Sequence, residues 1–132
     1  MSVRRQLRGE RGSNAVEFGL IVPLLLILVL GIVEFGHAFQ VQGTLSAAAR
    51  EGARAMALRN DPAQAKGAVR AAAGSLDPDI TDAQIAISPA ACPTGATTQN
   101  VTLTITYPMP FLTDFFGARV DLTGTGVMRC NG

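Results

Sequence analysis

Residues 18–33 read FGLIVPLLLILVLGIV, a run of sixteen residues with no charged and no hydrogen-bonding side chain. As an α-helix, this run extends about 24 Å, slightly less than the ~30 Å hydrocarbon core of a bilayer. Beyond Glu34, the side chains of Phe35, Ala38 and Phe39 lengthen the apolar face. The run therefore predicts a single membrane-spanning helix near the N-terminus.

The positive charges that flank this run lie before it. The chain has 11 basic and 10 acidic residues, and four of the basic ones, Arg4, Arg5, Arg8 and Arg11, precede the run. The next arginine after the run is Arg50. Because basic flanking residues stay in the cytoplasm when a helix inserts, we expect a cytoplasmic N-terminus and an extracytoplasmic C-terminal part. The expected location is the inner (cytoplasmic) membrane, with a single pass.

The chain that follows the basic N-terminal segment is weakly acidic. Residues 13–132 hold 7 basic and 9 acidic residues, a net charge of −2. A nucleic-acid-binding domain carries positive charge on its folded part, where it displaces counterions from phosphates. We therefore expect no nucleic acid among the partners. A length of 132 residues also leaves room for one small domain at most, which excludes a large multidomain enzyme.

Three interpretations compete for the apolar run. It can be an ordinary signal anchor, or a secretory signal cleaved after Ala38, where Gly36 and Ala38 are small residues at suitable positions. Glu34 interrupts the approach to that cleavage site. The third interpretation rests on the residues just before the run, where Gly12 is followed, after four residues, by Glu17.

Glu17 places a carboxylate just inside an apolar helix. A charge at that depth is costly unless it is paired or neutral, so such a residue suggests a function. The arrangement resembles the cleavage signal of type IV prepilins and pseudopilins, in which a membrane aspartyl peptidase cuts after the glycine. The resemblance implies a cut between Gly12 and Ser13 by a prepilin peptidase. It also implies that Glu17, then the fifth residue, pairs with the N-terminal ammonium of a neighbouring subunit.

The helix is expected to continue past the membrane, from about residue 14 to 59. Pro23 removes one helical hydrogen bond and predicts a kink or a locally loosened turn. Residues 38–59 contain no proline and are rich in helix formers. One face of this outer half, here called the small-residue stripe, consists of Leu45, Ala48, Ala49, Gly52 and Met56. Two interpretations stay open for the stripe, and both can hold: it packs against the chain's own sheet, or against helices of other subunits.

The remaining chain predicts a small α+β head. Asn60-Asp61-Pro62 ends the long helix, and residues 62–76 indicate a second, shorter amphipathic helix, which Pro62 begins. Residues 83–88, 100–107 and 118–129 alternate apolar and polar side chains, which is typical of a half-exposed antiparallel sheet. The predicted fold class is α+β, with a long transmembrane α-helix that continues outside the membrane and packs against a small antiparallel sheet. The expected division is a basic cytoplasmic leader (1–12), the helix (13–59) and an extracytoplasmic head (60–132).

Cys92 and Cys130 are the two cysteines of the chain, and they bracket the last two predicted strands. On the exported side of the membrane an oxidising compartment favours a disulfide between them. Their spacing excludes a CxxC redox pair, and two cysteines with the distant His37 make a poor zinc site.

No residues suggest catalysis, so we expect a protein that is not an enzyme and has no cofactor, metal or small-molecule substrate. A phosphate-binding glycine loop, an HExxH pair and a serine with a nearby base are all missing from the sequence. His37 is the only histidine, and we expect an interfacial or packing role for it. Asp77, Asp79 and Asp82 can be read as a calcium loop or, more simply, as a solvated turn.

The segments described above resemble the TadE-like proteins, bacterial pseudopilins of the tight-adherence (Tad/Flp) pilus system. The resemblance is strongest in residues 12–18, 23–26, 31–36 and 48–54, and weaker in residues 101–108 and 126–129. It implies insertion in the inner membrane, processing by a prepilin peptidase, and contacts with other pilin or pseudopilin subunits and the Tad machinery. The implied role is that of a subunit or assembly component of an adhesive pilus.

We expect the helix to dock beside pilin helices through the small-residue stripe. Glu17 is expected to neutralise an ammonium group. The head is expected to stay outside the membrane or on the pilus. The alternative is a membrane-anchored extracytoplasmic binding or adaptor module that never enters a filament. It shares every feature except the pairing of Gly12 with Glu17. A secretion ATPase and a prepilin peptidase encoded alongside would favour the pilus interpretation.

Overall fold

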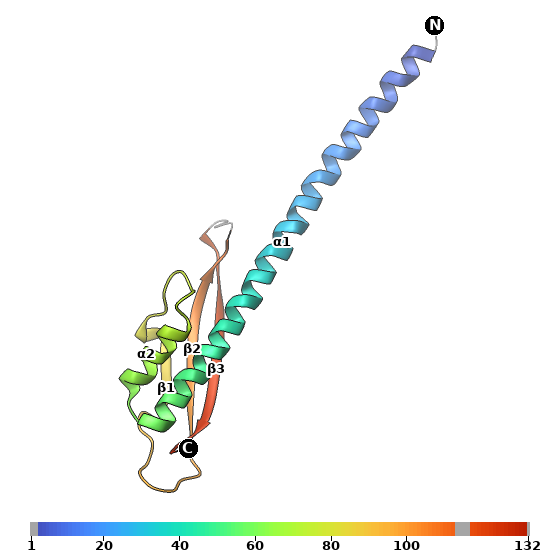
Figure 1. Cartoon of the computed structure of the whole chain (residues 1–132). Coiled ribbons are helices and arrows are strands. Elements are labelled where there is room, and N and C mark those ends of the chain that lie inside the picture. Colours follow the sequence, from blue (N-terminus) through green and yellow to red (C-terminus); the bar gives the residue numbers. More distant parts are fainter. Residues whose placement is uncertain (1–2, 113–116, 132) are drawn as a thin grey trace. The chain divides into compact units, whose positions relative to one another are not determined.

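The computed structural model describes residues 3–112 and 117–131. In chain order, its elements are α1 (Val3–Arg59), α2 (Pro62–Ala72), the short 3-10 helix η1 (Asp82–Gln84), and the strands β1 (Ile85–Ser88), β2 (Asn100–Pro110) and β3 (Arg119–Arg129) (Figure 1). A long N-terminal apolar helix and a small three-stranded antiparallel sheet make the fold α+β, as the sequence predicts. The chain divides into two compact units, here unit 1 (Met1–Gly36) and unit 2 (His37–Gly132).

α1 ends at Arg59, as predicted, but it begins at Val3 instead of at about residue 14. The residues before Gly12 are helical because arginine, glutamine, leucine and glutamate all have high helix propensity. Met1 and Ser2 of the expected leader lie outside the described residues. The helix is continuous through Pro23, so this proline does not divide α1 into two helices.

A short polar sequence separates α1 from α2. Asn60 takes a left-handed conformation with φ of 52°, and its N–H donates to the Met56 carbonyl at 2.9 Å, which closes the last turn of α1. Asp61 then caps α2, because its Oδ1 accepts a hydrogen bond from the Ala63 N–H at 2.9 Å. α2 ends four residues earlier than predicted, at Ala72, since Gly74 favours the end of a helix over its continuation.

The sheet has the order β1-β2-β3 and is antiparallel throughout. Ile105 in the central strand faces Ile85 on one side and Gly124 on the other. β2 alternates as predicted: its inward side chains are buried, whereas its threonines are exposed or half-buried. The inward side chains are Val101, Leu103, Ile105, Tyr107 and Met109, and the outward threonines are Thr102, Thr104 and Thr106.

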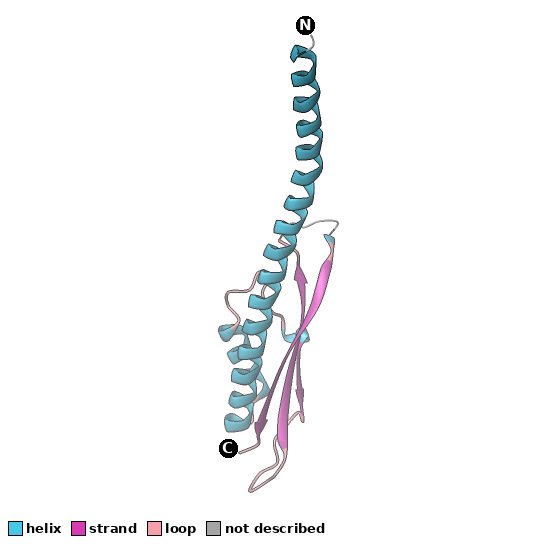
Figure 2. Cartoon of the chain, turned by 90° about the vertical axis from the view of Figure 1, so that its right-hand side faces the viewer, coloured by secondary structure: helices cyan, strands magenta, loops and turns pink. Residues whose placement is uncertain are grey.

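The C-terminal part of α1 and α2 cover one face of this sheet (Figure 2). The whole small-residue stripe is buried there, with Leu45, Ala48, Ala49 and Met56 at 0% exposure. A Cβ added to Gly52 would lie 2.6 Å from Leu103 Cδ1 and would also meet Val69 of α2, so the helices and the sheet approach closely at this glycine. The first interpretation of the stripe is therefore confirmed: it packs inside unit 2. The expectation that the stripe docks α1 beside pilin helices is wrong, because its side chains are already covered.

β3 packs directly against α1 at two glycines. A Cβ on Gly124 would lie 2.6 Å from the Leu45 carbonyl oxygen, and one on Gly126 would overlap the Ala49 carbonyl. One turn earlier on α1, Gln42 Nε2 donates to the Thr123 carbonyl oxygen at 2.7 Å. β3 and α1 therefore run side by side in the same chain direction.

Candidate functional site

Unit 1 exposes nearly all of its large apolar side chains. Phe18, Leu20 and Ile27 have exposed fractions of 70%, 72% and 68%. Among the described residues, one helix, within Arg11–Arg59, is long and apolar enough to cross a membrane. An apolar surface of this extent marks a membrane or protein contact. A single N-terminal apolar helix of this kind fits membrane anchoring.

The predicted cleavage position and the predicted pairing carboxylate lie close together on α1. Gly12, Ser13 and Glu17 are all exposed residues of this helix. A Cβ on Gly12 would meet nothing within 4 Å among the described residues, so none of them covers this turn. Ser13 and Glu17 are four residues apart and therefore neighbours on one helix face. An ammonium group at Ser13 and the Glu17 carboxylate would thus belong to the same patch of surface.

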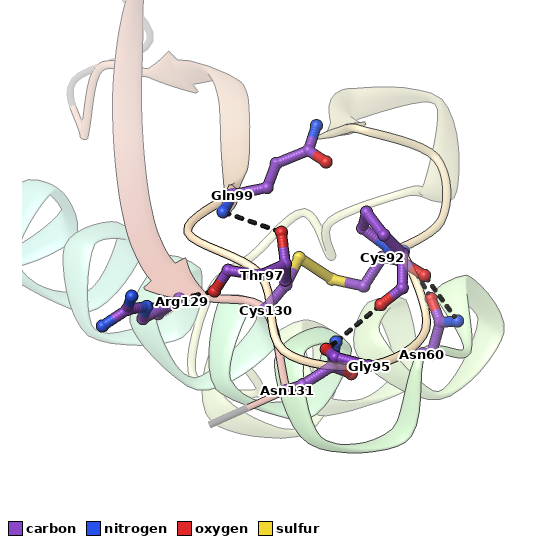
Figure 3. The surroundings of a disulfide bond; sticks show 9 residues. Asn60, Cys92, Gly95, Thr97, Gln99, Arg129, Cys130 and Asn131 are labelled. Atoms are coloured by element: carbon purple, nitrogen blue, oxygen red, sulfur yellow. Dashed lines mark hydrogen bonds between the residues drawn. A yellow bond between two sulfur atoms is a disulfide. The ribbon is translucent and has the colours of Figure 1, made fainter.

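A disulfide joins Cys92 and Cys130, as predicted, with a Cα–Cα distance of 5.6 Å (Figure 3). Both cysteines are buried, at 4% and 2% exposure. The Cys130 N–H donates to the Gln99 carbonyl at 2.9 Å, which holds the residue after β3 beside the residue before β2. The disulfide therefore closes the end of the sheet at which the loop from β1 enters β2.

The side chains of Asn60 and Asn131 fix this loop to α1, a role that the sequence patterns did not indicate. The Asn60 side chain forms a reciprocal pair with Cys92: Cys92 N–H donates to Oδ1 at 2.7 Å, and Nδ2 donates to the Cys92 carbonyl at 3.2 Å. Asn131 Nδ2 donates to the carbonyls of Pro93 and Gly95 at 2.6 and 3.0 Å (Figure 3). Both asparagines take a positive φ, 52° at Asn60 and 62° at Asn131, a conformation that asparagine tolerates at turns.

The Asn131 backbone also contacts the helix. Its N–H donates to the Ala57 carbonyl at 3.1 Å, near the end of α1. The disulfide, the two asparagines and this bond together connect the C-terminal end of the sheet, the loop before β2 and the C-terminal turn of α1.

A pocket of about 320 Å³, here the His37 pocket, lies at the other end of the sheet. The Tyr107 hydroxyl donates to the Pro78 carbonyl beside it at 2.8 Å. Burial raises the pKa of the Tyr107 phenol above its usual value of 10.0; the carboxylates of Asp77 and Asp79 raise it further, and the Arg119 guanidinium partly opposes them. The lining residues are His37, Val41, Ser75, Leu76, Asp77, Tyr107, Met109, Pro110, Phe111 and Leu112.

Tyr107 is expected to titrate above pH 10.0 in the folded chain. Because the folded state holds the phenol proton more tightly than the unfolded chain, the stability that this group contributes is present below pH 10.0 and is lost as the pH rises through the raised pKa. The chain has one tyrosine and no tryptophan, so phenolate absorbance reports Tyr107 alone. A midpoint no higher than that of the denatured chain would contradict this prediction.

The described part of the chain forms no metal centre: within it, no three His, Cys, Asp or Glu side chains gather as ligands. Asp82, one of the three aspartates considered for calcium, forms an ion pair with Arg70 of α2. His37 lies at the pocket just described.

Residues 12–54 match the family model described as TadE-like protein. The matched segment starts at Gly12, contains the apolar run, and ends within the outer half of α1; the weaker resemblance in residues 101–108 and 126–129 lies outside it. Neither the curated proteins nor the solved structures yielded a match.

Proposed function

We propose, from the premise that this chain is TadE-like over residues 12–54, that it is a pseudopilin-like subunit or assembly component of a Tad/Flp-type adhesive pilus. The TadE-like segment itself implies an association with the Tad pilus. In the proposal, residues 18–33 cross the inner membrane, the N-terminus is cytoplasmic, and the head lies outside. A prepilin peptidase removes the leader after Gly12.

The observation that carries this proposal is the position of Gly12 and Glu17 at the start of an exposed apolar helix. The family match begins at the same glycine. Val16 and Phe18, on either side of Glu17, have exposed fractions of 64% and 70%, so the carboxylate sits among side chains suited to lipid or to other helices. In such surroundings an unpaired charge is costly, and a positively charged partner would remove that cost.

Cleavage after Gly12 would create this partner. The cut leaves an ammonium group on Ser13, one helical turn before Glu17. Within one subunit the two groups share a face, and between subunits that are displaced along α1 the ammonium of one can reach the Glu17 of another. In the second arrangement, each added subunit neutralises a charge on its neighbour.

The proposal is tested by intact mass and N-terminal sequencing of the protein from its native membrane, with and without the prepilin peptidase. A chain that begins at Ser13 only when the peptidase is present supports processing. A retained leader would contradict processing and favour a permanent anchor. A chain that begins at Phe39 would indicate a secreted protein and contradict the membrane anchor.

Glu17→Gln is expected to weaken subunit incorporation by about 100-fold, since breaking a desolvated charge pair costs about 3 kcal/mol. The amide keeps the size of the side chain but cannot neutralise the ammonium. Piliation counted by electron microscopy measures the effect, with Glu51→Gln as the matched control on the exposed face of α1 in unit 2. Wild-type piliation in the Glu17→Gln strain would show that the carboxylate has no such role.

One observation favours a second candidate, a membrane-anchored adaptor that stays outside the filament. The small-residue stripe is buried under the chain's own sheet, so the outer half of α1 does not offer it to neighbouring helices. An adaptor needs only the head for its contacts. The two candidates differ in fractionation: a subunit is recovered in pili sheared from the cells, whereas an adaptor remains in the membrane fraction.

A further inference from the structure

β3 is an edge strand, since β2 is the only described strand that pairs with it (Figure 1). The Cys130 N–H, just after β3, donates to the Gln99 carbonyl of the β2 side. Because backbone groups of a strand alternate between its two edges, the even-numbered residues of β3 point theirs toward β2 and the odd-numbered ones toward the free side. The hydrogen bond from Gln42 Nε2 of α1 to the Thr123 carbonyl agrees with this direction.

The C-terminal half of β3, residues 125–129 and here called the free edge, has open backbone groups on that side. No described residue offers a partner to the N–H and C=O groups that Thr125 and Val127 direct there. A row of such groups is a template for a further strand. Proteins usually protect an edge with charges or proline, but residues 122–128 contain neither. The free edge is therefore open to pairing.

Exposed apolar side chains flank the free edge on both faces of the sheet. Val127 is 54% exposed on the face away from the helices, whereas Met128, 37% exposed, points to the helix side beside Leu58 of α1, 64% exposed. Met128 and Leu58 line a pocket of about 310 Å³, here the edge pocket, together with Arg54, Ala57 and Arg129. Because side chains of a strand alternate, a strand added beside β3 would place one set of side chains near Val127 and the other near the edge pocket.

The charges around the free edge are mainly basic. Arg54 and Arg129 line the edge pocket, and the backbone of Arg50 lies against Gly126 of β3. All three arginines are exposed, and within the described part of the chain none of them forms an ion pair. The acidic residue near them is Glu51, which lines a neighbouring pocket with Arg54. This excess of positive charge favours a partner that carries carboxylates.

We propose that the free edge binds an extended, acidic segment of another protein, which adds a fourth strand beside β3. Backbone hydrogen bonds to Thr125 and Val127 hold the segment, an apolar side chain enters the edge pocket, and carboxylates face the three arginines. All of these residues belong to unit 2, so the inference depends neither on the membrane anchor nor on cleavage after Gly12. It goes beyond the proposed function, because it specifies the surface and the chemistry by which the head captures a partner.

The probe is a capped, fluorescein-labelled peptide of alternating valine and glutamate. The comparison peptide has lysine in place of each glutamate. Binding of each peptide to the full-length chain in a non-ionic detergent is measured by fluorescence anisotropy. The acidic peptide is expected to bind about tenfold more tightly than the basic one, since like charges at an interface repel.

Val127→Pro tests the backbone hydrogen bonds. The N–H of residue 127 points to the free side, so proline removes a donor that the partner needs and none that β2 uses. We expect this variant to weaken binding of the acidic peptide by about tenfold. Val127→Thr keeps the N–H and nearly the same size, and it is expected to change binding by about twofold at most. The fluorescence of Tyr107 during unfolding shows whether each variant is folded.

Arg54→Gln tests the charges without altering the backbone of β3. Loss of one exposed charge at the edge pocket is expected to weaken binding of the acidic peptide by about threefold. Arg119→Gln is the matched control, because Arg119 is an exposed arginine at the opposite end of β3. This control is expected to leave the affinity unchanged.

Equal binding of the acidic and basic peptides would overturn the proposal, and so would unchanged binding by a folded Val127→Pro chain. If Val127→Pro does not fold, the comparison of Arg54→Gln with Arg119→Gln decides, and equal affinities of these two variants would contradict the proposal. A wild-type dimer that Val127→Pro converts to a monomer would show that a second copy occupies the free edge, and the acidic partner would then be wrong.

Discussion

Replacing Gly126 by valine is expected to destabilise unit 2 by about 3 kcal/mol, a large part of the stability of so small a domain. Any Cβ at this position would overlap the Ala49 carbonyl of α1. Backbone cannot move aside like the end of a flexible side chain, so β3 and α1 would have to separate. That separation would uncover Leu45 and Met56, both fully buried.

The measurement is denaturant unfolding of the full-length chain in detergent, followed by the fluorescence of Tyr107, the only tyrosine. Gly67→Ala is the control, because a Cβ at Gly67 would meet only the end of the Arg70 side chain, at 4.0 Å. This control is expected to be neutral or to stabilise α2 by up to about 1 kcal/mol. An unfolding midpoint for Gly126→Val equal to that of the wild type would show that the approach of β3 to α1 is looser than described.

Removing the disulfide with Cys92→Ala and Cys130→Ala is expected to cost about 4 kcal/mol, on the chain-entropy estimate for a closed loop of 39 residues. The bond restricts the unfolded chain, and it spans the loop before β2 together with β2 and β3. The free energy of unfolding of the double variant against the oxidised wild type measures the effect. Thiol labelling of the unreduced, denatured wild type should find no free thiol.

Asn131→Ala separates the covalent effect from the local hydrogen bonds. This variant removes the side-chain bonds to Pro93 and Gly95 but keeps the disulfide, and it is expected to cost only about 1–2 kcal/mol. If the double cysteine variant were no less stable than Asn131→Ala, the cross-link itself would add nothing to the fold.

Sequence patterns with a local physical cause predicted the structure well. The alternation of Val101 to Tyr107 fixed the inward face of β2, because the side chains of a strand alternate between its two faces. The end of α1 followed from Asn60-Asp61-Pro62, which closes one helix and begins the next. The disulfide was predictable because two cysteines on the side of the membrane that is expected to be oxidising favour pairing with each other.

Features that depend on a distant partner were not predictable in this way. The small-residue stripe was compatible with two packing partners, the chain's own sheet or helices of other subunits. Only the contacts of Gly124 with Leu45 and of Gly126 with Ala49 show that β3 of the same chain packs there. The same glycines weaken the apolar alternation of β3, so no apolar pattern indicated a contact there. Asn60 and Asn131 form their bonds to the loop at Cys92 across more than 30 residues, and no local pattern encodes those bonds.

The candidate site likewise has a part that the sequence predicted and a part that it did not. The apolar run and its neighbouring Gly12 and Glu17 were visible in the sequence because hydrophobicity and charge are properties of single residues. The His37 pocket was not singled out, since its lining comes from segments that are far apart in the sequence, His37 and Val41 of α1, residues 75–77 and residues 107–112. No short segment determines that these residues meet.

The parallel course of β3 and α1 also determines how the head responds to mechanical force. A pull along α1 from His37, resisted at the outer face of the sheet, loads the contact between β3 and the helix in shear. The Leu45–Gly124 and Ala49–Gly126 contacts then bear the load together and do not open one after another, as they would on peeling. At the far end, the bond from Asn131 to Ala57 keeps the strand from lifting first. The head is thus arranged to transmit tension between α1 and whatever holds its sheet.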